Sequence, residues 1–170
     1  MSLGKKILKY QEAVNKIKEC RERGLKVILT QGAFDIVHIG HIEYFREAKK
    51  LGDVLFVGVE NDKSVRINKG KKLPLNNLRD RLEFLTELKS VDYVFGFVDE
   101  PVYKKDKAFD MYTQRFKDLN PNIIVASTSE LASHLQLKKD QAKKVGIKII
   151  IVNHGKKNSS NKVLKVIGYD

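Results

Sequence analysis

Residues 27–41 read V-I-L-T-Q-G-A-F-D-I-V-H-I-G-H, and this stretch decides the expected fold. Its first four residues are a short apolar run, which is typical of a strand covered on both faces. A helix is predicted from about residue 39 to 51, since Ile42, Phe45 and Ala48 fall on one side and Gly52 follows the last turn. A strand that leads into a helix in this way is the first half of a βαβ unit.

The same alternation continues along the chain. Further apolar strands are predicted at residues 54–59, 91–98, 123–126 and 147–152, and helices at about 78–88, 105–119, 130–145 and 159–166. Residues 61–76 are polar and basic, and they are predicted to form a loop. The sequence therefore predicts a Rossmann-like, doubly wound α/β fold, with a parallel five-stranded sheet and helices on both faces.

An amphipathic helix is predicted before the first strand. Apolar residues recur there at steps of four and three, and Gly24 ends the pattern; they are Leu3, Ile7, Tyr10, Val14 and Ile17. We expect two parts, an N-terminal helix (1–24) packed on the domain or on a second subunit, and a main domain (25–170). A membrane-surface helix is disfavoured because Glu12, Glu19 and Glu22 interrupt the polar face.

Composition narrows the classes of protein. The 170 residues hold 33 Lys and Arg against 21 Asp and Glu, a formal net charge of +12, which favours an anionic partner without choosing among nucleic acid, acidic membrane and phosphorylated small molecule. The one cysteine, Cys20, excludes an intramolecular disulfide and a cysteine-based zinc cluster. Neither a membrane span nor a secretory leader is evident, so a cytoplasmic location is expected.

Ligands of an open parallel sheet bind outside the carboxyl ends of the strands, which directs attention to residues 31–41, 61–72 and 153–162. In the first segment, His38 and His41 flank the start of a helix, and Gly40 between them has no side chain. Two imidazoles beside free helical amides make an anion site suited to charge that grows during a reaction. No third ligand stands at suitable spacing for a histidine-based metal site, so no protein metal site is predicted.

The motif H-I-G-H, preceded by Q-G-A-F-D, resembles the H-x-G-H signature of the nucleotidylyltransferase superfamily. Residues 29–97 resemble its cytidylyltransferase-like branch, which includes glycerol-3-phosphate cytidylyltransferase and the adenylyltransferase domain of ADP-heptose synthesis in lipopolysaccharide core biosynthesis. Supporting motifs follow in order: K-K-L-G-D (49–53), N-D (61–62), K-G (69–70), N-N-L-R-D-R-L (76–82) and S-V-D-Y-V (90–94).

The resemblance implies transfer of a nucleotidyl group from ATP or CTP, with Mg²⁺ on the triphosphate, to a small phosphorylated acceptor such as a sugar or polyol phosphate. His38, His41 and Lys69 would be catalytic, and Lys69 and Lys72 would bind substrate phosphate. The expected nucleotide-binding set is Gly32, Ala33, Phe34, His38, Gly40, His41, Arg81, Asn158, Ser159 and Ser160. For Arg81 an ion pair with a neighbouring acid on the helix surface is the alternative, and Asp35 is expected to orient its loop or cap the helix. The resemblance further implies a homodimer that neither binds nucleic acid nor inserts into a membrane.

Three departures from the family pattern leave the base and the acceptor open. Position 33 is Ala where Thr or Cys is common, residues 125–130 read V-A-S-T-S-E in place of a glycine- and aspartate-containing loop, and the arginine that often precedes the Ser/Thr motif is missing. The alternatives are an FAD synthetase-like adenylyltransferase and a nucleotide-binding or nucleic-acid-binding protein without catalysis. A class I aminoacyl-tRNA synthetase also carries H-I-G-H, but the chain is short for one and has no K-M-S-K-S-type loop.

Overall fold

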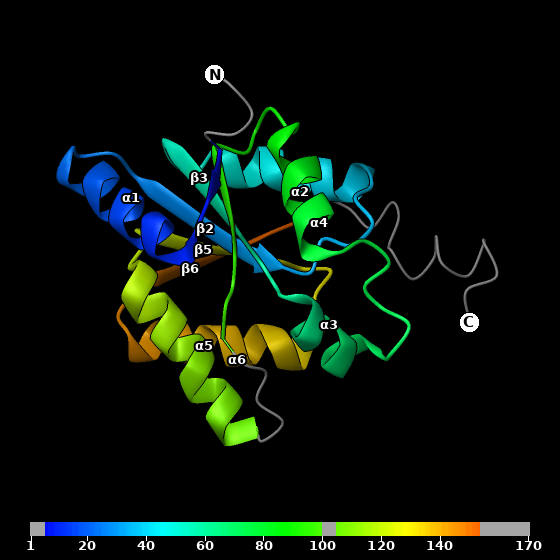
Figure 1. Cartoon of the computed structure of the whole chain (residues 1–170). Helices are drawn as coiled ribbons and strands as arrows, with labels where there is room; N and C mark the ends of the chain where they lie inside the picture. Colours follow the sequence, from blue (N-terminus) through cyan, green and yellow to red (C-terminus); the bar gives the residue numbers. More distant parts are fainter. Residues whose placement is uncertain (1–5, 100–104, 154–170) are drawn as a thin grey trace.

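A six-stranded parallel sheet forms the centre of the molecule in the computed structural model, which describes residues 6–99 and 105–153 (Figure 1). Along the chain the strands are β1 (Ile7–Leu8), β2 (Val27–Gly32), β3 (Val54–Val59), β4 (Tyr93–Gly96), β5 (Ile123–Ser127) and β6 (Lys148–Val152). Across the sheet their order is β1-β4-β3-β2-β5-β6, and every neighbouring pair is parallel. The predicted Rossmann-like, doubly wound fold is confirmed.

Helices cover both faces of this sheet (Figure 1). They are α1 (Tyr10–Glu22), α2 (Ile39–Lys49), α3 (Asp62–Lys69), α4 (Leu78–Thr86), α5 (Lys105–Leu119) and α6 (Ala132–Lys144). One core cluster joins α2 and α4 to the sheet through residues such as Phe45 and Leu85, and the other joins α1, α5 and α6 through Ile17, Phe116 and Ala142. In the described residues no helix has the length and hydrophobicity to cross a bilayer.

The prediction of five strands was wrong by one. Ile7 and Leu8 belong to an extended edge strand that pairs with Val94 and Phe95, and Val94 N–H donates to the Lys6 carbonyl at 3.0 Å. Helix α1 begins only at Tyr10, and the Glu12 carboxylate accepts from Lys9 N–H at 2.7 Å. A two-residue strand is too short to show a period of its own, so its apolar residues were counted with the helix that follows.

The prediction of a loop over residues 61–76 was also wrong in part, because α3 occupies its first half. The Asn61 side chain accepts from Ser64 N–H at 2.9 Å and caps the helix, and Asp62 stands in the first turn, where a negative charge stabilises the helix dipole. Gly70, with φ of 104°, ends it. The cap signals were present in the sequence, but eight mostly polar residues give little apolar periodicity.

The carboxyl edge of the sheet, where β2, β3, β4, β5 and β6 end, carries the candidate site. Strand order reverses between β2 and β5, since the chain passes from β2 to β3 on one side and from β5 to β6 on the other. A topological switch point of this kind is where open α/β sheets bind their ligands. The predicted last helix, 159–166, lies outside the described residues.

Candidate active site

His38 and His41 meet at the N-terminus of α2, directly beyond the carboxyl end of β2. His38 is the N-cap, with an extended backbone, and its Nδ1 accepts from Gly40 N–H at 3.2 Å. The two imidazole rings have centroids 4.1 Å apart and planes inclined by 33°. The sequence spacing of three therefore brings both rings to one place, as predicted, at the N-terminus of a helix. The expected free amides are not there at Gly40 and His41, whose N–H groups donate to the Nδ1 atom and the carbonyl of His38.

Phe34 packs against the histidine pair through its contact with His41. Its backbone lies in the left-handed region, with φ of 48°, a conformation that non-glycine residues adopt mainly where surrounding structure enforces it. The Phe34 ring packs edge-on against His41, with centroids 5.6 Å apart, and in a tilted arrangement against Phe45, with centroids 5.1 Å apart. A Cβ on Gly32 would lie 2.9 Å from the Phe34 ring, so a side chain at position 32 would force this ring to shift.

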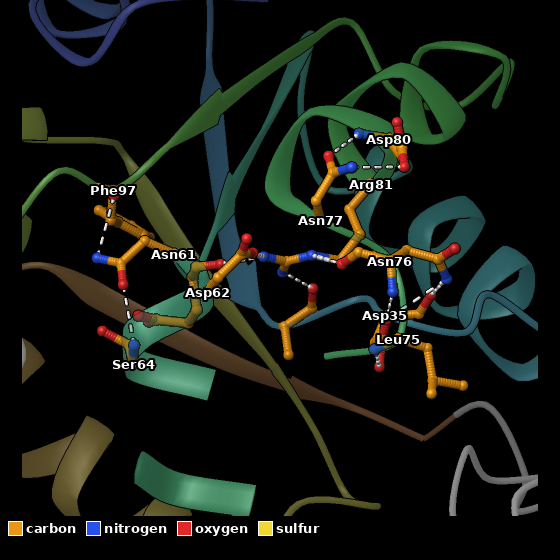
Figure 2. Close-up of polar contacts among 12 residues, drawn as sticks. Asp35, Asn61, Asp62, Ser64, Leu75, Asn76, Asn77, Asp80, Arg81 and Phe97 are labelled. Carbon is orange, nitrogen blue, oxygen red and sulfur yellow. Dashed lines mark hydrogen bonds and ion pairs between the residues drawn. The ribbon is translucent and has the colours of Figure 1, made fainter. Parts of the chain in front are cut away.

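Asp35 holds a second loop against the first. Its carboxylate accepts from the backbone N–H groups of Leu75 and Asn76, both at 2.8 Å, and the Asn76 amide donates to the Asp35 carbonyl at 2.7 Å (Figure 2). The expectation that Asp35 orients a loop is confirmed, but the loop is the one before α4. His38, and not Asp35, caps α2.

Arg81 on α4 is fully buried and ties three segments of the site together (Figure 2). Its guanidinium donates to the carbonyls of Ala33, Glu60 (2.8 Å) and Asn76 (3.1 Å), and it forms an ion pair with Asp62 at 2.7 Å. Four donations already occupy a group that has five N–H bonds. The geometry thus favours the ion-pair alternative, as a buried pair between helices, and a contact with triphosphate stays a prediction.

Lys69 is the last residue of α3. Although its side chain is exposed, neighbouring protein partly desolvates the ammonium, which lowers the pKa of Lys69; the field of Arg81 lowers it further and that of Asp35 opposes both. The predicted phosphate ligand therefore stands at the end of α3, within the electrostatic reach of Asp35 and Arg81. Lys72 is exposed three residues further on, in the segment between α3 and α4.

The loop after β5 is organised by its own hydroxyl and carboxyl groups. Ser127 N–H donates to Glu130 at 3.1 Å, the Ser127 and Ser129 hydroxyls lie 2.7 Å apart, and Lys138 forms an ion pair with Glu130 at 2.6 Å. This loop stands where the family pattern expects glycine and aspartate, at the switch point beside β2. Of the predicted site residues, Asn158, Ser159 and Ser160 lie outside the described residues.

Sequence reasoning missed a buried cluster beside the site. Arg115 of α5 forms ion pairs with Glu60, at 2.7 Å, and with Asp99, and its guanidinium lies 3.8 Å from the ring centroid of Phe97 and 4.5 Å from that of Tyr112. Burial disfavours the charged guanidinium, but the two carboxylates outweigh this and raise the pKa of Arg115. The partners stand 55 and 16 positions apart, so no local pattern could reveal them.

The chain matches a known protein family over most of its length. Residues 29–166, most of the chain, match the family described as cytidylyltransferase-like. The chain belongs to the cytidylyltransferase-like family. It is therefore a nucleotidyltransferase domain, and the histidine pair at the start of α2 belongs to its H-I-G-H motif.

Relatives in the cytidylyltransferase-like family agree with this assignment. The chain is 43% identical over 101 residues to the bifunctional protein HldE of Wolinella succinogenes and 42% identical over 94 residues to that of Erwinia tasmaniensis. These stretches cover 59% and 55% of this chain but 21% and 20% of the relatives, so the match spans about a fifth of their length.

Two solved structures share the fold. A lipopolysaccharide core biosynthesis protein from Thermoplasma volcanium superimposes with a TM-score of 0.59 at 31% identity, over 79% of this chain and all of that one. Pantoate-beta-alanine ligase from Francisella tularensis gives a TM-score of 0.65 at 18% identity, over 86% of this chain and 66% of that one, and shows a likeness of fold alone.

Proposed function

We propose that the chain transfers the nucleotidyl group of ATP or CTP to the phosphate of a small sugar or polyol phosphate and releases pyrophosphate. The observation that carries the proposal is the pair of imidazole rings, 4.1 Å apart, at the N-terminus of α2 and at the switch point of the sheet. Two imidazoles at the N-terminus of a helix, where the helix dipole favours negative charge, suit a triphosphate, whose charge must be stabilised as it shifts toward the leaving group.

The chemistry needs no covalent enzyme intermediate. An oxygen of the acceptor phosphate attacks the α-phosphorus, a new P–O bond forms, and the bond to the β-phosphate oxygen breaks as pyrophosphate leaves. His38 and His41 donate hydrogen bonds to the oxygens on the α-phosphorus, and the Lys69 ammonium neutralises charge that builds on the leaving phosphates. Catalysis then consists of positioning and electrostatic stabilisation, as in other phosphoryl-type transfers.

Mg²⁺ enters this proposal as a companion of the triphosphate. Over residues 6–99 and 105–153 no three His, Cys, Asp or Glu side chains gather as a metal-binding group, and both Asp35 carboxylate oxygens accept backbone N–H bonds. The residues present therefore do not fit a protein-held metal, and phosphate oxygens with water would be the ligands of the ion. Bound in that way, it would reduce the negative charge of the triphosphate.

Sequence likeness narrows the substrates that we propose. The relatives include a lipopolysaccharide core biosynthesis protein, and the motifs resemble the adenylyltransferase domain of ADP-heptose synthesis, so a sugar phosphate is the first acceptor to test and ATP the first donor. The loop Ser127–Glu130 departs from the family pattern at the switch point, so CTP belongs in the same test. A homodimer is proposed as well, to be tested by sedimentation.

The test is a matrix of pyrophosphate-release assays. ATP and CTP, each with Mg²⁺, are paired with sugar 1-phosphates, polyol phosphates and FMN, and the nucleotidyl product is identified by mass spectrometry. Release with a sugar or polyol phosphate, abolished in His41→Ala, supports the proposal. Release with FMN alone contradicts it in favour of an FAD synthetase-like adenylyltransferase. Nucleotide binding without release from any pair contradicts it and favours a non-catalytic nucleotide-binding protein. Salt-sensitive binding of duplex DNA without affinity for nucleotides contradicts it in favour of a nucleic-acid-binding protein.

A further inference from the structure

Glu60 joins the two buried arginines of the molecule. It follows directly after β3, its backbone carbonyl accepts from Arg81 at 2.8 Å, and its carboxylate accepts from Arg115 at 2.7 and 3.3 Å. Arg81 also donates to the carbonyl of Ala33 in the loop that leads to the histidines. A continuous chain of hydrogen bonds therefore runs from α5 through Glu60 to the β2–α2 loop.

A second branch of the same network leads to α3. Arg115 pairs with Asp99, the Asp99 carbonyl accepts from the Asn61 amide at 2.9 Å, and Asn61 caps α3 through Ser64 N–H at 2.9 Å. Figure 2 shows Asn61 between Phe97 on one side and Ser64 on the other. Helix α3 ends at Lys69, so the position of the lysine depends on how its helix is held at the start.

Arg115 itself is not placed to bind substrate. Its helix packs on the face of the sheet opposite to α2, which carries the histidines. Nε and both Nη atoms donate to Glu60 or Asp99, and Phe97 and Tyr112 cover its planar faces. A buried guanidinium engaged in this way can affect the reaction only through the groups that it holds.

We propose that Glu60 and Arg115 are positioning residues, which set Lys69 and the Ala33 loop relative to the histidine pair. The role of Lys69 in this inference rests on the proposed function. The physical reason is that a shift of about 1 Å in a charged group can lower a rate by a factor of about 100 when catalysis depends on positioning. Breaking the Glu60–Arg115 pair is expected to displace α3 and to lower kcat about tenfold while KM changes little.

The chain offers a matched control at the other end of β3. Asp92 forms an ion pair with Lys49 and accepts from Leu55 N–H at 2.7 Å. Asp92→Asn and Glu60→Gln each convert a partly buried, ion-paired carboxylate into an amide. Glu60 is connected to the Ala33 loop, whereas Lys49, the partner of Asp92, lies at the end of α2 that is remote from the histidines. A role confined to stability would give both variants a lower Tm and an unchanged kcat per folded molecule.

The first measurement does not depend on turnover. The pKa of Lys69 is read by NMR after ¹³C-methylation of the lysines, with Lys69→Arg to assign its signal, in the wild-type chain, Glu60→Gln, Arg115→Lys and Asp92→Asn. Asp35 and Arg81 are the charged groups whose fields shift the pKa of Lys69. We expect its pKa to rise toward the ordinary lysine value in the first two variants, because the ammonium gains solvent, and to stay unchanged in Asp92→Asn. An equal pKa in all four proteins overturns the inference.

The second measurement is a double-mutant cycle on kcat for pyrophosphate release. If Glu60 acts through Lys69, then Glu60→Gln combined with Lys69→Ala is no slower, within about twofold, than Lys69→Ala alone. Losses that simply multiply overturn the inference, even where the reaction itself is observed. If the wild-type chain releases no pyrophosphate with any pair, the proposed function fails, and the pKa of Lys69 alone decides whether the network positions it.

Discussion

The ring centroids of His38 and His41 lie 4.1 Å apart, and the first of the two rings also caps the helix that carries the second. One residue thus fixes where α2 begins while its neighbour three positions on is held by the Phe34 ring at 5.6 Å. The two imidazole rings are held in place by the N-cap hydrogen bond of His38, by the contact of His41 with Phe34 and by the helix itself. Preorganisation of this kind allows hydrogen-bond donors to act without reorganising during the reaction.

Replacing either histidine should lower kcat strongly but reduce the free energy of unfolding only slightly. We expect His41→Ala to lower kcat by a factor of about 100 to 1,000, which is the usual loss when one donor to a transition-state oxygen is removed. His38→Ala should lower kcat similarly and also destabilise the chain by about 1 kcal/mol, because it removes the N-cap of α2. Steady-state kinetics and thermal unfolding separate the two effects. A kcat near the wild-type value in either variant contradicts the assignment.

Lys69 should contribute to kcat, whereas the nearby Lys71 should not. We expect Lys69→Ala to lower kcat about 10- to 100-fold, whereas Lys71→Ala, which removes the same charge two residues away, should stay within about twofold. The comparison uses the same pyrophosphate-release assay for both variants. Equal losses would mean that the basic segment acts only through its total charge.

The alkaline side of the rate profile should report the lowered pKa of Lys69. Desolvation lowers this pKa from its ordinary value of 10.5, so the ammonium is lost, and kcat falls, at a lower pH than for a solvated lysine. Between the lowered folded pKa and the unfolded one, the unfolded chain binds more protons, so the contribution of Lys69 to stability rises with pH there. Lys69→Arg keeps its charge at high pH and should move the fall in kcat upward; an unmoved profile assigns it to another group.

Arg81 should be required for stability. Arg81→Met leaves the Asp62 carboxylate without its buried partner and three carbonyls without a donor, so we expect the free energy of unfolding to fall by about 3–5 kcal/mol. Arg79, on the same helix, pairs with Glu83 in solvent, and Arg79→Ala should change stability by less than about 0.5 kcal/mol. Denaturant unfolding measures both. A small loss in Arg81→Met would show that its hydrogen bonds are replaced by water.

Tyr44 links the histidine helix to two strands at the switch point. Its buried hydroxyl donates to the Val125 carbonyl at 2.9 Å and hydrogen-bonds to Thr30 of β2. We expect Tyr44→Phe to lower the free energy of unfolding by about 1–3 kcal/mol, because two buried polar groups lose their partner. The double variant with Thr30→Val should recover part of that loss. No recovery would mean that Thr30 is satisfied without the tyrosine.

The sequence by itself determined five of the six strands, the parallel sheet and the place of the histidine pair, but neither β1 nor α3. These follow from local patterns: apolar runs of strand length, helical spacing of apolar residues, and glycines at turns. His38 and His41 were predictable as a pair because three residues at the start of a helix bring side chains together whatever the rest of the chain does. The strand at Ile7–Leu8 could not be predicted, because two residues are too few to show an alternation of apolar and polar side chains.

Only the tertiary structure decided what the buried charges do. Arg81 reaches Ala33 and Asp62, and Arg115 reaches Glu60 and Asp99, across 16 to 55 positions of sequence. An arginine in a helical pattern looks like a solvated side chain until the sheet brings carbonyls and carboxylates from other segments around it. Burial then changes its role, because in a low dielectric a charge must be paired, and the pairing fixes the segments that supply the partners.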